Sequence, residues 1–314
     1  MRLGFIGTGV MGHSMVKHLL ARGDKVTVYN RTFAKSQALE PFGAVAAASI
    51  PDLVAKSPDG VLCMVGYPAD VDQVLLGAGG VLDSIRSGSN PIVIDLTTSS
   101  PTLARTVYER AKEKNIVAVD APVTGGDVGA REGKLSILVG AESQGVFDRA
   151  KPILSAFGTP RLMGGPGMGQ QTKLANQVVI AGAMIGVVEG MVFAHKSGIS
   201  LDAYIEAISG GGAASKSLSL YAPRIMAGDF RPGFFVDHFV KDLGLALDEC
   251  RRMGLALPGL ALVSQLYSSL QGHGEGHLGT QALILAIDRL SKADGPWMAA
   301  HDAAAAADNK RARS

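Results

Sequence analysis

The stretch Leu3-Gly4-Phe5-Ile6-Gly7-Thr8-Gly9-Val10-Met11-Gly12 decides the fold. Residues 3–6 form an apolar run of strand length, and a segment with helical spacing follows at 15–21. Between them, Gly7 allows a tight turn, Gly9 lets a ligand approach the backbone, and Gly12 lets the helix pack on the strand. This order predicts a dinucleotide-binding loop, and the alternative is a glycine-rich turn without a ligand. The expected cofactor contacts are Gly7, Thr8, Gly9, Val10, Met11 and Gly12.

Strand and helix patterns alternate through the first half of the chain. Apolar runs at 26–29, 61–65, 92–96, 117–119 and 136–139 are predicted strands, and helical segments are expected from residue 70 and at 103–114. Such alternation is typical of a doubly wound parallel sheet with right-handed crossovers. We therefore predict an α/β fold with an N-terminal Rossmann domain over residues 1–163.

The second half lacks strand patterns. Helical segments are expected at 171–198, 201–209, 217–226, 241–253, 260–271 and 278–292. These segments predict an all-helical C-terminal domain over residues 164–298. Residues 299–314 have no apolar period and are expected to form a flexible tail.

Charge and hydrophobic patterning argue against nucleic-acid and membrane binding. The formal net charge is +2, and no basic stripe is present. The longest apolar stretch, 178–194, contains a glutamate and several glycines, so we read it as a buried helix. No targeting segment precedes the first predicted strand, which favours a cytoplasmic location.

Cysteine and histidine usage gives no metal site. Cys63 and Cys250 lie far apart without a CxxC motif, so they are expected to be reduced core thiols. His273 and His277 flank a glycine-rich segment that predicts a loop and not a zinc-binding helix.

The residues after the second predicted strand bear on cofactor choice. They are Asn30, Arg31 and Thr32, with no acid to bind a ribose 2′-hydroxyl. A guanidinium can pair with a 2′-phosphate, which favours NADP over NAD. The alternative is a solvated arginine, with Asn30 serving NAD. Met64 and Val65, where the predicted strand 61–65 ends, are also expected to border the cofactor.

Besides the glycine loop, the chain contains four further motifs, which are Asp120-Ala121-Pro122-Val123-Thr124-Gly125-Gly126, Gly167-Met168-Gly169-Gln170-Gln171-Thr172-Lys173-Leu174-Ala175-Asn176-Gln177, Lys241-Asp242-Leu243, and Asp95-Leu96-Thr97-Thr98 with Pro101. With these motifs the sequence resembles one family, the β-hydroxyacid dehydrogenases, from residue 1 to about residue 290. The resemblance implies a nicotinamide-dependent oxidoreductase that interconverts a small β-hydroxy acid and its semialdehyde or keto form.

Hydride transfer needs a proton donor and acceptor at the reacting oxygen, and Lys173 is the candidate. Asn176 lies three residues later on the same helical face and can hold the substrate or the lysine. Gln177 has two readings, a substrate contact or a polar contact between helices. The alternative for Lys173 is an ordinary surface lysine.

The remaining candidates are expected to bind the ends of the reactants. Thr124, Gly125 and Gly126 can give the substrate carboxylate a hydroxyl and backbone N–H groups. Thr98 can position the nicotinamide or cap the helix before Pro101. Lys241 can reach the cofactor from the helical domain, or form an exposed pair with the aspartate that follows it.

Two departures leave the substrate open. Gln177 stands where many members have a second asparagine, which looks more like the tartronate semialdehyde reductase branch, and the segment at 279–281 lacks an acid common in other branches. NADPH-dependent reduction of glyoxylate, succinic semialdehyde or tartronate semialdehyde is the alternative. A non-catalytic dinucleotide-binding module is the alternative from another class. A 6-phosphogluconate-type decarboxylating enzyme is disfavoured, because its much longer helical domain and phosphate-binding basic residues are not evident in this sequence. The apolar long helix predicts a homodimer or homotetramer.

Overall fold

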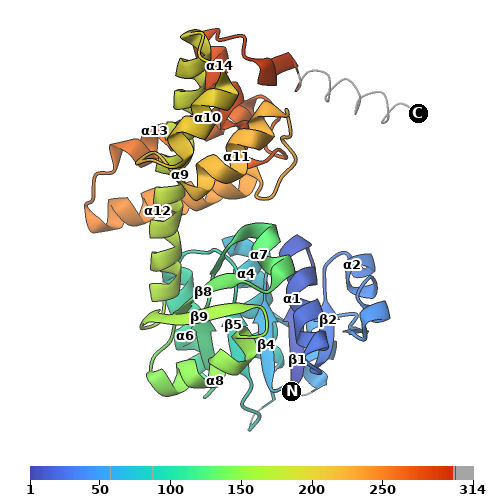
Figure 1. Cartoon of the computed structure of the whole chain (residues 1–314). Helices are drawn as coiled ribbons and strands as arrows, with labels where there is room; N and C mark the ends of the chain where they lie inside the picture. The colour runs from blue at the N-terminus through green and yellow to red at the C-terminus, as the bar shows by residue number, and fades with distance from the viewer. Residues whose placement is uncertain (57, 87, 300, 302–314) are drawn as a thin grey trace. The chain divides into compact units, whose positions relative to one another are not determined.

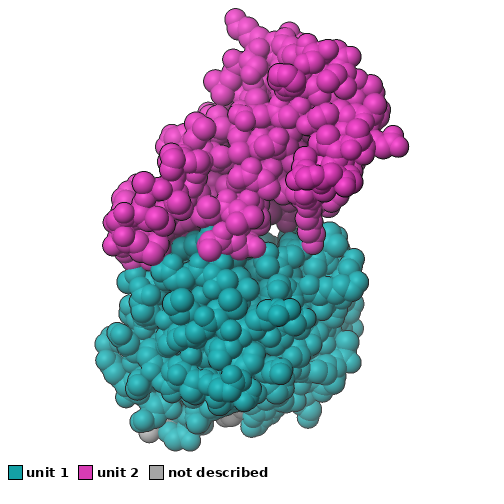
Figure 2. Space-filling model, turned by 60° about the vertical axis from the view of Figure 1, so that its left-hand side comes forward, with its two compact units in different colours: residues 1–174 teal, residues 175–314 magenta. Residues whose placement is uncertain are grey.

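The computed structural model describes residues 1–56, 58–86, 88–299 and 301. The chain divides into two compact units, residues 1–174 and 175–314 (Figure 2). The sequence placed the boundary near residue 163, before the long helix, whereas the division between the two units falls between residues 174 and 175, within that helix. The predicted tail lies outside the described residues except at positions 299 and 301.

The described residues of unit 1 form a nine-stranded sheet (Figure 1). The path runs β3-β2-β1-β4-β5-β6-β8-β7, with β9 paired to β8. In chain order the strands are β1 (Arg2–Ile6), β2 (Lys25–Tyr29), β3 (Val45–Ala46), β4 (Gly60–Cys63), β5 (Ile92–Asp95), β6 (Val117–Asp120), β7 (Val123–Thr124), β8 (Leu135–Gly140) and β9 (Gly158–Gly164).

The strands from β3 to β6 are all parallel, which confirms the predicted doubly wound sheet. The strand order turns back between β1 and β4. A crevice at the carboxyl ends of the strands beside such a switch point is where α/β sheets bind ligands. The glycine loop follows β1 directly, so the fold places it at this edge.

The far edge of the sheet differs from the prediction. β8 is antiparallel to β6 and β7, and parallel to β9. The sequence did not predict β9, because its partly buried positions alternate with the exposed residues Thr159, Arg161 and Met163 and it has no continuous apolar run.

Helices cover both faces of the sheet. They are α1 (Val10–Ala21), α2 (Phe33–Gln37), α3 (Ile50–Ala55), α4 (Pro68–Leu75), α5 (Val81–Ser84), α6 (Pro101–Glu113), α7 (Gly126–Glu132) and α8 (Gln144–Leu154), with a 3-10 turn at Glu40–Phe42. Successive strand residues enter different cores: Phe5 belongs to one buried apolar cluster and Ile6 to the other. This two-sided burial explains why the strands read as continuous apolar runs.

The long helix α9 (Met168–Lys196) begins in unit 1 and continues into unit 2. Unit 2 also contains α10 (Leu201–Ser209), α11 (Lys216–Met226), α12 (Val236–Met253), α13 (Pro258–Gly272) and α14 (Leu283–Ser291). The helix predicted at 278–292 begins only at Leu283, because a 3-10 turn at Thr280–Ala282 occupies its expected first residues, and α12 begins five residues earlier than predicted. The described part of this unit is helical apart from its loops, as predicted.

Helix α9 is long and apolar enough to cross a membrane by length and composition alone. In its most apolar window, 39% of the residues are buried. The core helix of a globular protein passes the same test, so this finding is weak evidence for a membrane.

The glycine loop depends on close backbone approach. Gly7 has φ +92°, and a Cβ there would lie 2.1 Å from the carbonyl oxygen of Met64. A Cβ on Gly12 would lie 2.0 Å from the carbonyl oxygen of Gly7. The predicted turn and packing roles of these two glycines are therefore present in the structure.

We expect Gly12→Ala to lower the free energy of unfolding by at least about 2 kcal/mol, because the Gly7 carbonyl cannot move without opening the turn. The matched control is Gly244→Ala in the interior of α12, where a Cβ would meet nothing within 4 Å. This control should be neutral or stabilising by up to about 1 kcal/mol. Urea unfolding measures both, and equal stabilities would contradict the packing argument.

Candidate active site

The glycine loop is fixed by Asn30 at the end of β2. The Asn30 Oδ1 accepts a hydrogen bond from the Thr8 backbone N–H at 3.0 Å, and the Gly7 N–H donates to the Tyr29 carbonyl at 2.9 Å. Asn30 therefore has a structural role that its predicted cofactor contact did not include.

The loop has the shape that a pyrophosphate requires. A Cβ on Gly9 would meet no atom within 4 Å, so its backbone is open to a ligand. Gly9 is the N-cap of α1, and the N–H groups of Val10 and Met11 lie in the first turn, where a helix provides no internal acceptor. A helix N-terminus of this kind binds anions through these groups and the helix dipole. The residues present fit a dinucleotide.

Arg31 is available to a ligand beside this loop. Its side chain is 88% exposed, and its Nη1 lies 3.4 Å from Asp70 Oδ1 on α4. An exposed pair of this length contributes little to stability, so the guanidinium can turn to a phosphate at small cost. Thr32 is the N-cap residue of α2 without a side-chain capping bond.

The residues after β4 and β5 meet at the same edge. The Met64 N–H donates to the Ile6 carbonyl at 2.8 Å, and the Val65 N–H donates to Thr97 Oγ1 at 3.0 Å.

The alternative prediction, that Thr98 caps the helix before Pro101, is wrong. The N-cap residue of α6 is Ser100, whose side chain accepts hydrogen bonds from the backbone N–H groups of Thr102 and Leu103.

The turn after β7 has the predicted backbone form. Gly125 has φ +131° and Gly126 has φ +65°, both in the region that side chains rarely adopt. Thr124 ends the strand immediately before them. Whether this turn binds a carboxylate stays a prediction.

Lys173 is buried in α9, with only 7% of its surface exposed. The reading of an ordinary surface lysine is therefore wrong, since lysine is seldom buried without a specific reason. Asn176 follows it by three residues on the same helix and is partly buried.

The glycines before Lys173 serve close packing. A Cβ on Gly169 would lie 2.3 Å from the Leu138 carbonyl oxygen, and Gly167 has φ +85°. Any larger residue at Gly169 would push the first turn of α9 away from the sheet.

Sequence reasoning did not assign a role to Asp120, Gln170 or Thr97. The Asp120 carboxylate accepts hydrogen bonds from the N–H groups of Gly167 at 2.7 Å and Gln170 at 2.8 Å. Burial raises the pKa of Asp120 to about 6, while these backbone hydrogen bonds act in the opposite direction. The sequence did contain an indication of these roles, because Asp120 ends a predicted strand region and Gln170 lies three residues before Lys173.

In unit 2 a chain of polar groups joins α9 to α12. Asn176 Nδ2 donates to Gln177 Oε1 at 2.9 Å, and Gln177 Nε2 donates to Asp242 Oδ2 at 2.6 Å. The Lys241 ammonium lies 3.0 Å from Asp242 Oδ1, with 12% and 1% of the two side chains exposed. The helix–helix contact expected for Gln177 is confirmed, and the lysine–aspartate pair is buried and not exposed.

The structure also shows where the cysteines and two of the histidines lie. Cys63 and Cys250 are buried free thiols. His273 caps the end of α13, and His277 lies in the following loop. Among the described residues, no group of three or more His, Cys, Asp or Glu side chains could hold a metal ion.

Comparison with known proteins identifies the family. Residues 2–174 match the NAD binding domain of 6-phosphogluconate dehydrogenase, and residues 167–287 match the NAD-binding domain of NADP-dependent 3-hydroxyisobutyrate dehydrogenase. A probable 3-hydroxyisobutyrate dehydrogenase-like 1, mitochondrial, from Arabidopsis thaliana is 53% identical over 291 residues, covering 92% of this chain and 86% of that protein.

Two more distant relatives agree. The 2-hydroxy-3-oxopropionate reductase of Escherichia coli is 33% identical over 292 residues, covering 93% of this chain and 98% of that protein. The solved 3-hydroxyisobutyrate dehydrogenase of Mycobacterium tuberculosis with L-serine has a TM-score of 0.82 at 28% identity, covering 91% of this chain and 98% of that one.

The resemblance stated from the motifs is thereby confirmed, and the reading as a non-catalytic module is set aside. The chain belongs to the β-hydroxyacid dehydrogenase family and is an NAD(P)-dependent oxidoreductase acting on a CH–OH group.

Proposed function

We propose that the protein interconverts a small β-hydroxy acid and its semialdehyde or keto form, with Lys173 as the general acid and base. The observation that carries this proposal is a lysine buried in the helix that begins beside the carboxyl edge of the sheet. When bound, the nicotinamide supplies or accepts the hydride. Lys173 donates a proton to the carbonyl oxygen during reduction and removes it from the hydroxyl during oxidation.

The other residues orient the substrate. The N–H groups of the Gly125–Gly126 turn and the Thr124 hydroxyl bind the carboxylate, which fixes the distance between that group and the reacting carbon. Asn176 hydrogen-bonds to the hydroxyl or carbonyl of the substrate. Gln177 acts through Asn176, because its own amide is already bound to Asn176 and Asp242.

The names of the relatives support the substrate class. They include 3-hydroxyisobutyrate dehydrogenase-like proteins and 2-hydroxy-3-oxopropionate reductase, whose substrates are small hydroxy acids or their semialdehydes. Gln177 favours the second type, so tartronate, glyoxylate or succinic semialdehyde reduction with NADPH is the alternative.

For the cofactor we propose a preference for NADP. No acid follows β2, and Arg31 is exposed beside the loop. Thr98 and Lys241 are proposed to contact the nicotinamide end of the cofactor. Met64 and Val65 are proposed to border the cofactor as well.

For the assembly we propose a homodimer or homotetramer. Val179 and Phe193 on α9 are 71% and 73% exposed, and 39% of the residues in the most apolar window of the helix are buried, which leaves apolar surface that an interface between subunits would cover. Sedimentation showing only monomers would remove this proposal. A cytoplasmic location remains a prediction, and the Arabidopsis relative's name places that protein in mitochondria.

We expect Lys173→Ala to lower kcat by at least about a thousandfold, because the proton then has no donor at the reacting oxygen. The dissociation constant for NADPH should change by less than about threefold, since the lysine acts on the substrate oxygen. Steady-state assays with 3-hydroxyisobutyrate, glyoxylate and the two semialdehydes, with fluorescence titration of NADPH, measure both. A variant that keeps its turnover would contradict the assignment.

We expect Arg31→Ala to weaken NADPH binding about tenfold to a hundredfold through loss of a charge-assisted hydrogen bond, while NADH binding is nearly unchanged. Arg110→Ala, an exposed arginine paired with Glu113 on α6, is the matched control. A wild-type protein that prefers NAD would contradict the reading of Arg31.

A further inference from the structure

We propose that Asp120 and Gln170 are positioning residues that fix the first turn of α9 on the sheet and thereby set where the Lys173 ammonium lies. This inference rests on the proposed role of Lys173. The sequence predicted no role for either residue. Here both are assigned the role of placing the proton donor relative to the edge of the sheet where the cofactor is expected.

The Asp120 carboxylate is restrained by hydrogen bonds and by close packing. Its two oxygens accept hydrogen bonds from different N–H groups, those of Gly167 and Gln170. A Cβ on Gly140 would lie 2.3 Å from Asp120 Oδ1, and one on Gly169 would lie 2.8 Å from Asp120 Oδ2. The two glycines leave just enough room for the carboxylate, so the first turn of α9 has one position against β6.

Gln170 makes a second attachment from the helix itself. Its Nε2 donates to the Thr97 carbonyl at 2.8 Å, and its Oε1 accepts from the Ser99 N–H at 2.9 Å. The side chain is fully buried. Both ends of the amide are used, and Lys173 follows three residues later on the same helical face.

Thr97 connects this attachment to the expected cofactor site. Its Oγ1 accepts from the Val65 N–H at 3.0 Å, and its own N–H donates to Asp95 Oδ1 at 2.9 Å. The loops after β4 and β5 and the start of α9 therefore share one hydrogen-bonded network. A shift of the helix would change the distance between Lys173 and the edge that these loops form.

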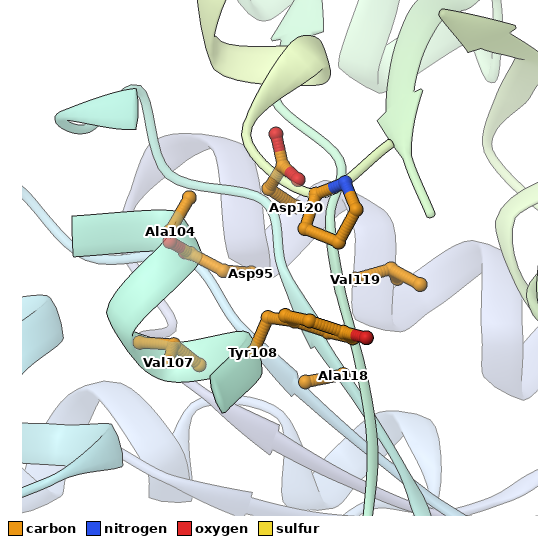
Figure 3. Close-up of a pocket in the computed structure, with 8 residues that line it drawn as sticks. Asp95, Ala104, Val107, Tyr108, Ala118, Val119 and Asp120 are labelled. Carbon is orange, nitrogen blue, oxygen red and sulfur yellow. The ribbon is translucent and has the colours of Figure 1, made fainter. Parts of the chain in front are cut away.

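The cavity beside Asp120 is small. Residues that include Asp95, Tyr108 and Asp120 line a cavity of about 10 Å³, and Figure 3 shows these side chains. This volume is at the lower limit for one water molecule. A variant side chain at Asp120 therefore has to displace its neighbours or lose its hydrogen bonds.

The test compares Asp120→Asn with Asp288→Asn. Asp288 is a buried carboxylate in α14 that accepts from the Gly295 N–H at 2.9 Å and from Trp297 Nε1 at 2.7 Å, so the same substitution removes a similar attachment in unit 2. The measurements are kcat, KM, the NADPH dissociation constant, the melting temperature and amide hydrogen exchange in the peptide 167–174. Gln170→Glu, which places an oxygen opposite the Thr97 carbonyl, is the second variant.

For Asp120→Asn we expect kcat to fall by at least about tenfold, with hydrogen exchange in 167–174 accelerated, because small misplacements of a catalytic group are costly. NADPH affinity should stay within about threefold, and Asp288→Asn should lower the melting temperature while keeping kcat within about twofold. If Asp120→Asn does not fold, the same kcat loss is expected for Gln170→Glu.

The proposal is overturned if a folded variant of Asp120 or Gln170 keeps kcat within about twofold, or if Asp288→Asn loses kcat to the same extent. Failure of the function itself is distinguishable, because Lys173→Ala would then retain turnover. Loss of activity in Lys173→Ala with unchanged kcat in Asp120→Asn would reject the positioning role alone.

Discussion

The attachment of α9 to the carboxyl edge of the sheet through the Asp120 carboxylate is the interaction on which the site depends. Burial raises the pKa of this group from 3.8 to about 6, which means that keeping it ionised at neutral pH costs about 3 kcal/mol of stability relative to an exposed aspartate. That cost is present above pH 6 and absent below pH 3.8. The fold retains the charge because the N–H groups of Gly167 and Gln170 need an acceptor at a buried helix start.

Glycine spacing explains how much of this architecture could be predicted. Gly7 and Gly12 lie where a Cβ has no room, and Gly9 where the backbone is open, so three positions in one motif carried three separate physical requirements. β9 could not be predicted in the same way. β9 forms by pairing with β8, which precedes it in the chain, and its residues are only partly buried, as is usual for a strand at the edge of a sheet.

Polar partners were the hardest part of the site to predict. Gln170 and Thr97 are 73 residues apart, and no local pattern reveals which carbonyl a buried amide will meet. For Gln177 the sequence allowed two interpretations, a substrate contact or a contact between helices. Its hydrogen bond to the Asp242 carboxylate on α12 shows the contact between helices. Lys173 could be chosen from its motif, but only its burial removed the ordinary reading of a solvated charge.

The central claim is that an amine at position 173 moves the proton, and it is tested by rebuilding that amine chemically. Lys173→Cys should be inactive, and alkylation with 2-bromoethylamine should restore activity by creating a side chain with an amine at nearly the same distance. Position 173 is buried like the two native thiols, so the alkylation is carried out on the unfolded protein before refolding. Wild-type protein treated in the same way controls for modification of Cys63 and Cys250. The account predicts recovery of at least about a tenth of wild-type kcat after alkylation. Activity in the unmodified cysteine variant, or no recovery in a fully alkylated folded protein, would contradict it.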